Sequence, residues 1–198
     1  MSTNNYFEKN TSQLKLLKEI IKQSSDRVLS DEPDELFSTN VNFFVKSYLI
    51  SICTYLESYL QEVAFELAKG ICERANSANI PHNFLYWMTA KEIKEKDLKF
   101  TSATFKITKE KISDELSGNP YKTIRLFRFL GINLSSEVEF TNKKDLVNAI
   151  VNKRNQIVHH NNSANDVSFN DLLHNIDLVV SYMNIIQQCV DGVKKGMS

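Results

Sequence analysis

A short stretch of the sequence combines a cation, an amide and two imidazoles within an otherwise apolar helical pattern. It contains Arg154, Asn155, His159 and His160. A guanidinium stays charged at every pH that a cell reaches, whereas an imidazole ordinarily exchanges protons near neutrality. Asn155 and His159 are four residues apart and share one face of a helix, where the amide can orient the ring. This stretch is therefore a candidate site at which an anion is held beside a proton-exchanging ring.

The stretch lies in a predicted amphipathic helix. Thr141 or Asn142 is the expected N-cap, and Asp145 falls in the first turn, where a negative charge suits the helix dipole. Apolar residues recur at the three- and four-residue spacing of one helix face: Leu146, Val147, Ile150, Val151, Ile157 and Val158. Because Arg154 falls inside this stripe, its side chain needs an anion or acceptors there. The polar residues 160–166 predict a loop at the mouth of the site.

The spacing R-N-x-x-x-H resembles the signature of HEPN domains, all-helical modules that include many metal-independent ribonucleases of toxin–antitoxin and anti-phage systems. The layout is most similar to that of stand-alone RiboL-PSP-type HEPN proteins. The resemblance implies Arg154 as a phosphate clamp, Asn155 as a positioning residue and His159 as the acid/base. A register one residue later, with His160 in that role, stays open. It also implies RNA as substrate, with neither metal nor cofactor.

The chemistry that the resemblance implies is transesterification of RNA. The ribose 2′-hydroxyl attacks the neighbouring phosphate and leaves a 2′,3′-cyclic phosphate and a 5′-hydroxyl end. On an ideal helix Arg154 and His159 lie about 140° apart and about 7.5 Å along the axis. They can converge on one phosphate only if the helix unwinds near His159 or if two chains face each other. HEPN nucleases generally pair motif helices across a two-fold axis, which predicts a homodimer through the motif helix.

Glu57 is an exception on the longest predicted helix. The face on which it lies is otherwise apolar and includes Ile50, Cys53, Leu60 and Ala64. A buried carboxylate must be paired, hydrogen-bonded or protonated, and Arg154 is the obvious candidate partner. HEPN families often carry a polar or acidic residue on an earlier helix near the motif, and residues 55–59 resemble that element. Glu57 turned toward water, or a purely structural bridge to a lysine, are the alternatives.

The predicted fold is an all-α, HEPN-like antiparallel helical bundle that occupies residues 1–198 as a single domain. A first helix follows capping candidates Asn10, Thr11 and Ser12, and a long central helix begins at about Thr39 or Asn40. The central helix ends near residues 74–75 and is either a continuous spine or slightly broken at a glycine. Its apolar positions are Val45, Leu49, Ile52, Leu56, Tyr59, Leu60, Val63, Leu67 and Ile71.

Residues 77–107 predict an irregular insertion in the bundle. Phe84, Leu85, Trp87 and Met88 form an apolar group that is expected to cap one end of the bundle. Trp87 in particular is expected in the core.

A basic helix face is predicted after the insertion. Asn119 as N-cap with a proline in the first turn opens a short helix, which carries Lys122, Arg125 and Arg128 beside two phenylalanines, Phe127 and Phe129. Basic and aromatic side chains together can hold a phosphate backbone and stack a base, so these three cations are candidate RNA-binding residues. The same pattern is also typical of the wet side of an amphipathic helix.

Helix-end signals mark the remaining elements. Gly131 supplies a left-handed stop for the basic helix. Ser168 and Asp171 form a capping box for the last helix, with Val167 and Leu172 placed as a hydrophobic staple.

Composition limits the classes of function. Lys plus Arg equal Asp plus Glu at 24 each, so RNA binding requires a local patch and not a global field. Three distant cysteines, Cys53, Cys72 and Cys189, predict reduced thiols and neither a disulfide framework nor a zinc site. The N-terminal residues lack a secretory pattern, and no apolar run reaches membrane-spanning length. We therefore expect a cytoplasmic protein without a membrane partner.

Three functions compete. The first is a HEPN endoribonuclease that acts as a toxin or defence effector, with an antitoxin or defence-system partner. The second is a non-catalytic HEPN-like module that binds nucleotide, RNA or protein, in which Arg154 and Glu57 form a structural ion pair. The third, a metal hydrolase built on His159 and His160, is the weakest, because adjacent residues point apart on a helix and no carboxylate cluster accompanies them.

Overall fold

The chain is almost entirely helical in the computed structural model, which describes residues 3–89, 95–160 and 164–196. In these ranges the elements are α1 (Thr3–Leu29), α2 (Glu35–Thr39), α3 (Val41–Ser77), α4 (His82–Thr89), η1 (Glu95–Asp97), α5 (Lys109–Glu115), α6 (Pro120–Phe129), η2 (Leu134–Ser136), α7 (Val138–His160) and α8 (Phe169–Gly196). The only β pairing in the same ranges is an isolated bridge between Pro81 and Ser102. The predicted all-α class is confirmed. No helix in the described part has both the length and the apolar character needed to cross a membrane.

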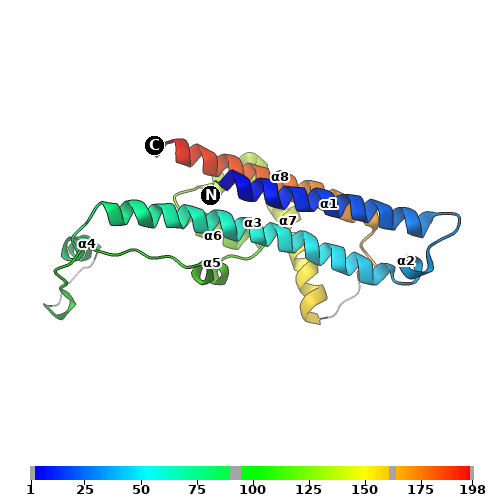
Figure 1. Cartoon of the computed structure of the whole chain (residues 1–198), viewed down its shortest axis with the longest axis horizontal. Coiled ribbons are helices and arrows are strands. Elements are labelled where there is room, and N and C mark those ends of the chain that lie inside the picture. The colour runs from blue at the N-terminus through cyan, green and yellow to red at the C-terminus, as the bar shows by residue number, and fades with distance from the viewer. Residues whose placement is uncertain (1–2, 90–94, 161–163, 197–198) are drawn as a thin grey trace.

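Three long helices lie side by side and make the body of the molecule (Figure 1). α3 and α8 both run antiparallel to α1, and each of the three contacts the other two. α7 packs against α3 and α8, and α5 and α6 also contact α3. The C-terminal end of α7, yellow in Figure 1, points away from this three-helix body. The residues of the R-N-x-x-x-H stretch therefore lie on a helix that starts in the core and ends outside it.

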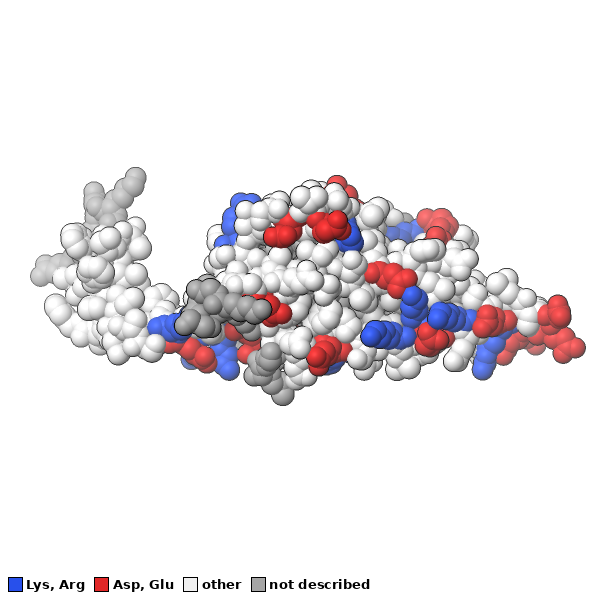
Figure 2. All heavy atoms as spheres, turned by 90° about the horizontal axis from the view of Figure 1, so that it is seen from above, with Lys and Arg blue, Asp and Glu red and all other residues white. Residues whose placement is uncertain are grey.

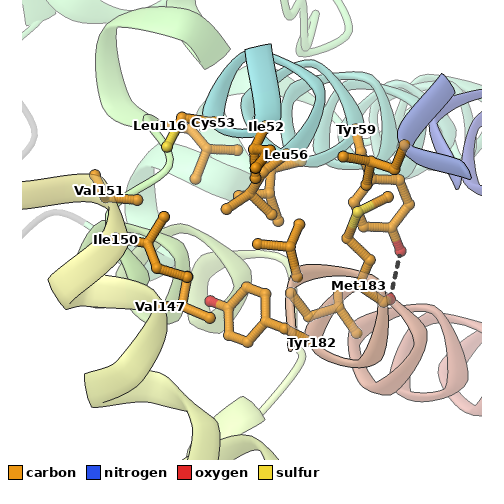
Figure 3. Packing of buried hydrophobic residues seen from close by; sticks show 14 of the residues in the cluster. Ile52, Cys53, Leu56, Tyr59, Leu116, Val147, Ile150, Val151, Tyr182 and Met183 are labelled. Carbon is orange, nitrogen blue, oxygen red and sulfur yellow. Dashed lines mark hydrogen bonds between the residues drawn. The ribbon is translucent and has the colours of Figure 1, made fainter. Parts of the chain in front are cut away.

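One continuous apolar core joins α3, α7 and α8 (Figure 3). Leu56 and Tyr59 of α3, Val147 of α7 and Met183 of α8 are all fully buried in it. The Tyr59 hydroxyl donates to the Met183 carbonyl at 3.0 Å and to Oε1 of Gln187 at 3.2 Å. The polar end of this buried tyrosine is thus satisfied, and it ties α3 to α8.

α3 is the central spine of the fold. It is an unbroken helix of 37 residues, which at 1.5 Å per residue spans about 55 Å, and Gly70 does not interrupt it. The predicted bounds agree with the observed ones to within about three residues. Its apolar positions face several neighbours at once, because α1, α8, α7, α5 and α6 all contact it. Glu57 lies on this helix between Leu56 and Tyr59, both of which are fully buried.

The acidic connection after α1 leads into a helix that the sequence pattern did not predict. The side chain of Asp34 accepts hydrogen bonds from the backbone N–H groups of Leu36 and Phe37 and so caps the five-residue α2. The Phe37 ring stacks on Phe44 at a centroid distance of 4.5 Å. The helix is too short to show a periodic pattern, so only its cap could have indicated it.

The first helix begins earlier than predicted. Asn10 and Thr11, expected as caps together with Ser12, lie in the interior of α1, and the first two are buried. Nδ2 of Asn10 donates to the Tyr6 carbonyl at 2.9 Å and to Glu62 of α3 at 3.2 Å. Asn10, which resembles a cap in the sequence, is thus used for contact with α3.

The motif helix also begins earlier than predicted. α7 starts at Val138, so the expected caps Thr141 and Asn142 lie inside it, and Glu139 takes the place in the first turn that Asp145 was expected to fill. The reason is Phe140, which is fully buried and packs in a tilted arrangement against Tyr182 of α8, at a centroid distance of 4.9 Å. Core packing therefore extends the helix by one turn.

Several helix-end signals are confirmed. The backbone N–H of Ser168 donates to Asp171 at 2.8 Å, and the N–H of Asp171 donates to the Ser168 hydroxyl at 3.1 Å, as a capping box requires. Asn119 caps α6 through its side-chain oxygen. Gly131 follows α6 with a φ of 82°, a conformation that favours glycine.

The described part of residues 77–107, a range predicted as an irregular insertion, forms an arm that projects from the end of α3 (Figure 1). Asn76 fixes its return: its side chain accepts from the Phe105 N–H at 2.8 Å and donates to the Phe105 carbonyl at 3.0 Å. The predicted burial of Trp87 is wrong. Phe84, Trp87 and Met88 are 52%, 64% and 63% exposed, because α4 lies out on the arm and away from the bundle.

The buried face of α3 gives a direct test of the fold. Leu56→Ala should lower the free energy of unfolding by about 2–5 kcal/mol, because Leu56 is fully buried and its truncation leaves a cavity. Urea denaturation followed by circular dichroism measures this change. Leu29→Ala, at a position that is 78% exposed, is the matched control and should change stability little. Equal effects of the two substitutions would contradict the packing described for α3.

Candidate functional site

An ion pair between Glu57 and Arg154 joins the middle of α3 to the R-N-x-x-x-H stretch of α7. Nη2 of Arg154 donates to Oε2 of Glu57 at 2.7 Å. The side chains of Arg154 and Glu57 retain 18% and 29% exposure, so both charges are largely withdrawn from water. The predicted partnership is present, in place of the alternatives of a water-facing or lysine-paired Glu57.

Cys53, one turn before Glu57, shows how apolar this part of α3 is. Its side chain is fully buried, and burial raises the pKa of the Cys53 thiol to about 11, although the charge of Arg154 acts in the opposite direction. The thiol is therefore neutral at pH 7. Nε of Arg154 is buried and has no hydrogen-bond partner among the described residues. Glu57 is thus the group that fixes the guanidinium.

Gln61 holds the second oxygen of Glu57. Its Nε2 donates to Oε1 of Glu57 at 3.4 Å and to the Leu116 carbonyl at 3.0 Å. Leu116 ends α5, and the connection that follows packs directly on α7: a Cβ at Gly118 would lie 3.3 Å from Val151. The turn between α5 and α6 therefore links the two helices that carry the ion pair.

The structure separates Asn155 and His159 from this buried pair. Asn155 is half-buried, His159 is exposed, and no hydrogen bond between their side chains is found in the described part of the chain. The side chain of His160 lies outside the described residues, as do residues 161–163 of the predicted loop. The choice between His159 and His160 as acid/base therefore stays as the sequence left it.

Helix geometry decides how Arg154 and His159 can act together. α7 remains α-helical through His160, so the unwinding that would bring the two side chains together does not occur. Arg154 points toward α3, and a residue five positions later lies about 140° around the axis and about 7.5 Å farther along it. Within one chain the two side chains therefore leave α7 on different sides.

The loop after α7 is tied back to the bundle where it is described. Lys153 forms an ion pair with Asp166, and the Ala164 N–H donates to the side chain of Asn42 on α3 at 2.8 Å. Hydrogen bonding and the charge of Lys153 lower the pKa of Asp166. These contacts hold Ala164 and Asp166 against α3 and α7.

The basic face of α6 is exposed as predicted, but its aromatic neighbours are not equivalent. Lys122, Arg125 and Arg128 are all exposed, and Arg125 pairs with Glu115 at 3.2 Å. Phe127 is fully buried and cannot stack a base, whereas Phe129 is 73% exposed. On the face shown in Figure 2, basic and acidic side chains alternate and no broad single-sign surface appears.

A pocket beside the ion pair was not predicted. It has a volume of about 360 Å³, and Glu57 forms part of its wall together with Thr54, Ser58, Gln61, Glu62, Phe65 and Lys109. Thr54, Ser58, Gln61 and Phe65 follow at intervals of four, three and four, which is one stripe of α3 next to Glu57. This polar stripe is the sequence signal that could have revealed it.

Neither a disulfide nor a metal-ligand cluster is present in the described part of the chain. Cys53, Cys72 and Cys189 are free thiols. No group of three or more His, Cys, Asp or Glu side chains that could hold a metal ion occurs within the described ranges.

The ion pair predicts a measurable coupling between α3 and α7. Glu57→Ala and Arg154→Ala should each lower the free energy of unfolding, because either change leaves a mostly buried charge without its partner. The double variant should lose less than the sum, with a coupling of roughly 1–2 kcal/mol from urea unfolding. The exposed pair Lys22–Glu19 is the control and should show a smaller coupling. Simple additivity at Glu57 and Arg154 would show that the pair does not join the helices energetically.

Comparison with known proteins gives one result. The family model for RiboL-PSP-HEPN matches residues 7–192, which is nearly the whole chain. No curated protein and no solved structure matches the sequence. The matched range contains the long helices α3, α7 and most of α8, together with the Glu57–Arg154 pair that joins two of them. The chain belongs to the RiboL-PSP-HEPN family, a family of HEPN domains.

Proposed function

We propose that this HEPN protein is a metal-independent endoribonuclease that cleaves RNA by transesterification. The 2′-hydroxyl of a ribose loses its proton and attacks the adjacent phosphorus, and the 5′-oxygen of the next nucleotide leaves and is protonated. The products are a 2′,3′-cyclic phosphate and a 5′-hydroxyl end. This reaction requires a fixed positive charge on the phosphate oxygens and a group that exchanges protons near neutrality.

The observation that carries the proposal is how α7 presents these two groups. Arg154 is held by Glu57 at 2.7 Å, so its guanidinium is oriented before any RNA binds. His159 is exposed, near the end of a helix that points away from the bundle. A pre-oriented cation and an accessible imidazole on one helix are what a phosphate clamp and an acid/base require. We assign Asn155 to positioning the substrate or the ring, and Glu57 to positioning Arg154.

The reaction needs two chains in this proposal. Arg154 and His159 do not converge on one helix, whereas two α7 helices related by a two-fold axis place both copies of each residue in one cleft. The projecting end of α7 is free for this contact in the single chain, and Val158 beside His159 is an apolar side chain with 51% exposure. We propose that Val158 is covered in the homodimer.

The exposed cations of α6 fit a path for the RNA backbone. Lys122 and Arg128 form no ion pair with another residue in the described part of the chain, whereas Arg125 is paired with Glu115. We propose contacts from all three to phosphates outside the cleft, with Phe129 as the exposed aromatic ring beside them. The cellular role we propose is that of a toxin or anti-phage effector in the cytoplasm, controlled by an antitoxin or defence-system partner.

A non-catalytic RNA- or protein-binding module is the second candidate. The observation that favours it is the same ion pair: Glu57 neutralises Arg154, and an arginine with 18% exposure can serve α3–α7 packing alone. This candidate predicts binding without turnover, so an assay of RNA cleavage separates the two.

His159→Ala should abolish cleavage if the proposal is correct. Removal of an acid/base group lowers a rate by about 10²–10⁴-fold. The measurement is cleavage of labelled RNA in excess EDTA, with the 2′,3′-cyclic phosphate identified by mass spectrometry. His174→Ala is the matched control, because His174 is an exposed histidine on α8, where its ring contacts a carbonyl of its own helix. Growth arrest on expression should follow the same pattern.

Three results would contradict the nuclease proposal. Cleavage that persists in His159→Ala moves the acid/base role away from His159, and a parallel His160→Ala variant tests the neighbouring register. Cleavage that requires a divalent ion favours metal-dependent chemistry. Tight RNA binding without any product favours the non-catalytic module.

Mixing two inactive variants tests the shared cleft. Arg154→Gln and His159→Ala homodimers each lack both copies of one residue, whereas a heterodimer of the two contains one intact Arg154 and one intact His159. We expect cleavage to reappear when the variants are refolded together, at a fraction of the rate of the unaltered protein. Val158→Asp should shift the protein from dimer to monomer in sedimentation and remove the activity. Rescue in a monomer, or no rescue in a demonstrated heterodimer, would contradict a cleft built by two chains.

A further inference from the structure

The pocket between α3 and the start of α5 shares a wall with the Glu57–Arg154 pair. Oε2 of Glu57 bonds Arg154, while Glu57 also lines the pocket, whose volume is about 360 Å³. That volume exceeds what one nucleobase needs. A group bound there would therefore lie next to Glu57, whose carboxylate also bonds the guanidinium that is proposed to hold the scissile phosphate.

Several polar groups of the pocket lack partners of their own. The hydroxyls of Ser47, Ser51 and Thr54 donate to the carbonyl four residues earlier, which is the ordinary arrangement on a helix. Ser58 forms no such hydrogen bond in the described structure, and it lines the pocket. The amide oxygen of Gln61 likewise accepts no hydrogen bond from the described residues, since both of its recorded bonds use Nε2.

Acceptors outnumber donors on the α3 side of the pocket. Oε1 of Glu57 receives only a long bond of 3.4 Å from Gln61, and the Gln61 oxygen is free of described donors. A ligand that satisfies them must present adjacent N–H groups. Among the four RNA bases guanine alone carries two neighbouring donors, N1–H and N2–H₂, on its Watson–Crick edge.

Phe65, farther along α3, and Lys109 of α5 supply an aromatic ring and a cation to the pocket. Phe65 is half-buried, and the Lys109 ammonium lies 5.7 Å from its ring centroid. Lys109 is exposed and pairs with no carboxylate in the described part of the chain. A base that stacks on Phe65 would displace the ammonium from above the ring, and the long Lys109 side chain would then reach toward the phosphate of that nucleotide. Aromatic stacking with a backbone cation is how single-stranded RNA is commonly held.

We propose that this pocket binds one guanine nucleotide of single-stranded RNA. Phe65 stacks the base, Glu57 and Gln61 accept from its Watson–Crick edge, and Lys109 contacts its phosphate. This inference rests on the proposed function for its biological meaning, because it names the residues that would choose the cleavage position. The binding itself can be measured without any cleavage.

The test is titration of the intact protein with each of the four nucleoside 5′-monophosphates. Binding is measured by calorimetry and by changes in the amide chemical shifts of α3 and α5. Guanosine monophosphate should bind at least about tenfold more tightly than the other three. Phe65→Leu and Lys109→Ala should weaken that binding by roughly tenfold or more, as loss of a stacking or phosphate contact does. Lys111→Ala, an exposed lysine on the same helix, and Phe43→Leu, an exposed phenylalanine near the start of α3, are the matched controls and should bind as the unaltered protein does.

Each outcome separates this proposal from the nuclease assignment. Guanosine binding that depends on Phe65 and Lys109, in a protein that cleaves no RNA, supports the pocket and removes the nuclease. RNA cleavage with no guanosine binding, and with cut positions unchanged in Phe65→Leu, overturns the pocket and leaves the nuclease intact. Equal binding of all four nucleotides also overturns the proposal, because it denies the base recognition by Glu57 and Gln61. Circular dichroism of each variant confirms that the helices are retained.

Discussion

Burial of α3 on almost every side is the constraint on which the structure depends. Six other helices of the described part of the chain contact it, and apolar residues occupy nearly all of its inward positions. A charge on such a helix is costly unless a partner meets it, and Arg154 meets Glu57 from α7 at 2.7 Å. This contact and the buried apolar side of α7 together turn Arg154 toward α3. On an ideal helix His159 then lies about 140° around the axis from Arg154, which is why the proposed cleft includes a second chain.

Much of the fold could be predicted because its signals are local. The apolar spacing of α3, the Asn119 cap of α6 and the capping box before α8 each depend on residues within a few positions of one another. The Glu57–Arg154 contact could be predicted from the sequence for a different reason. A carboxylate in one apolar stripe and a guanidinium in another each need a counter-charge when they are buried. Each is therefore the expected partner of the other.

The features that the sequence did not predict depend on distant contacts. Asn10 resembles a cap but reaches Glu62 on another helix, and Phe140 extends α7 because the core receives its ring. Trp87 is exposed because α3 carries the arm away from the bundle, a consequence of helix length and not of residue type. The pocket beside Glu57 also needs α5 to bring Lys109 over Phe65. Residue spacing within one helix does not predict which other helix packs against it.

The long sequence separation of the stabilising contacts has a consequence for biosynthesis. Glu57 and Arg154 are 97 positions apart, and the bond from Gln187 to Thr3 spans 184 positions. On the ribosome, α1 and α3 can pair while α7 and α8 are still absent. One apolar side of α3 therefore stays uncovered until the last part of the chain has been made. A translating ribosome would thus carry Glu57 without Arg154 while the 97 residues that lead from one to the other are added. For a protein proposed to cleave RNA, a nascent chain that ends before Arg154 would lack the proposed phosphate clamp.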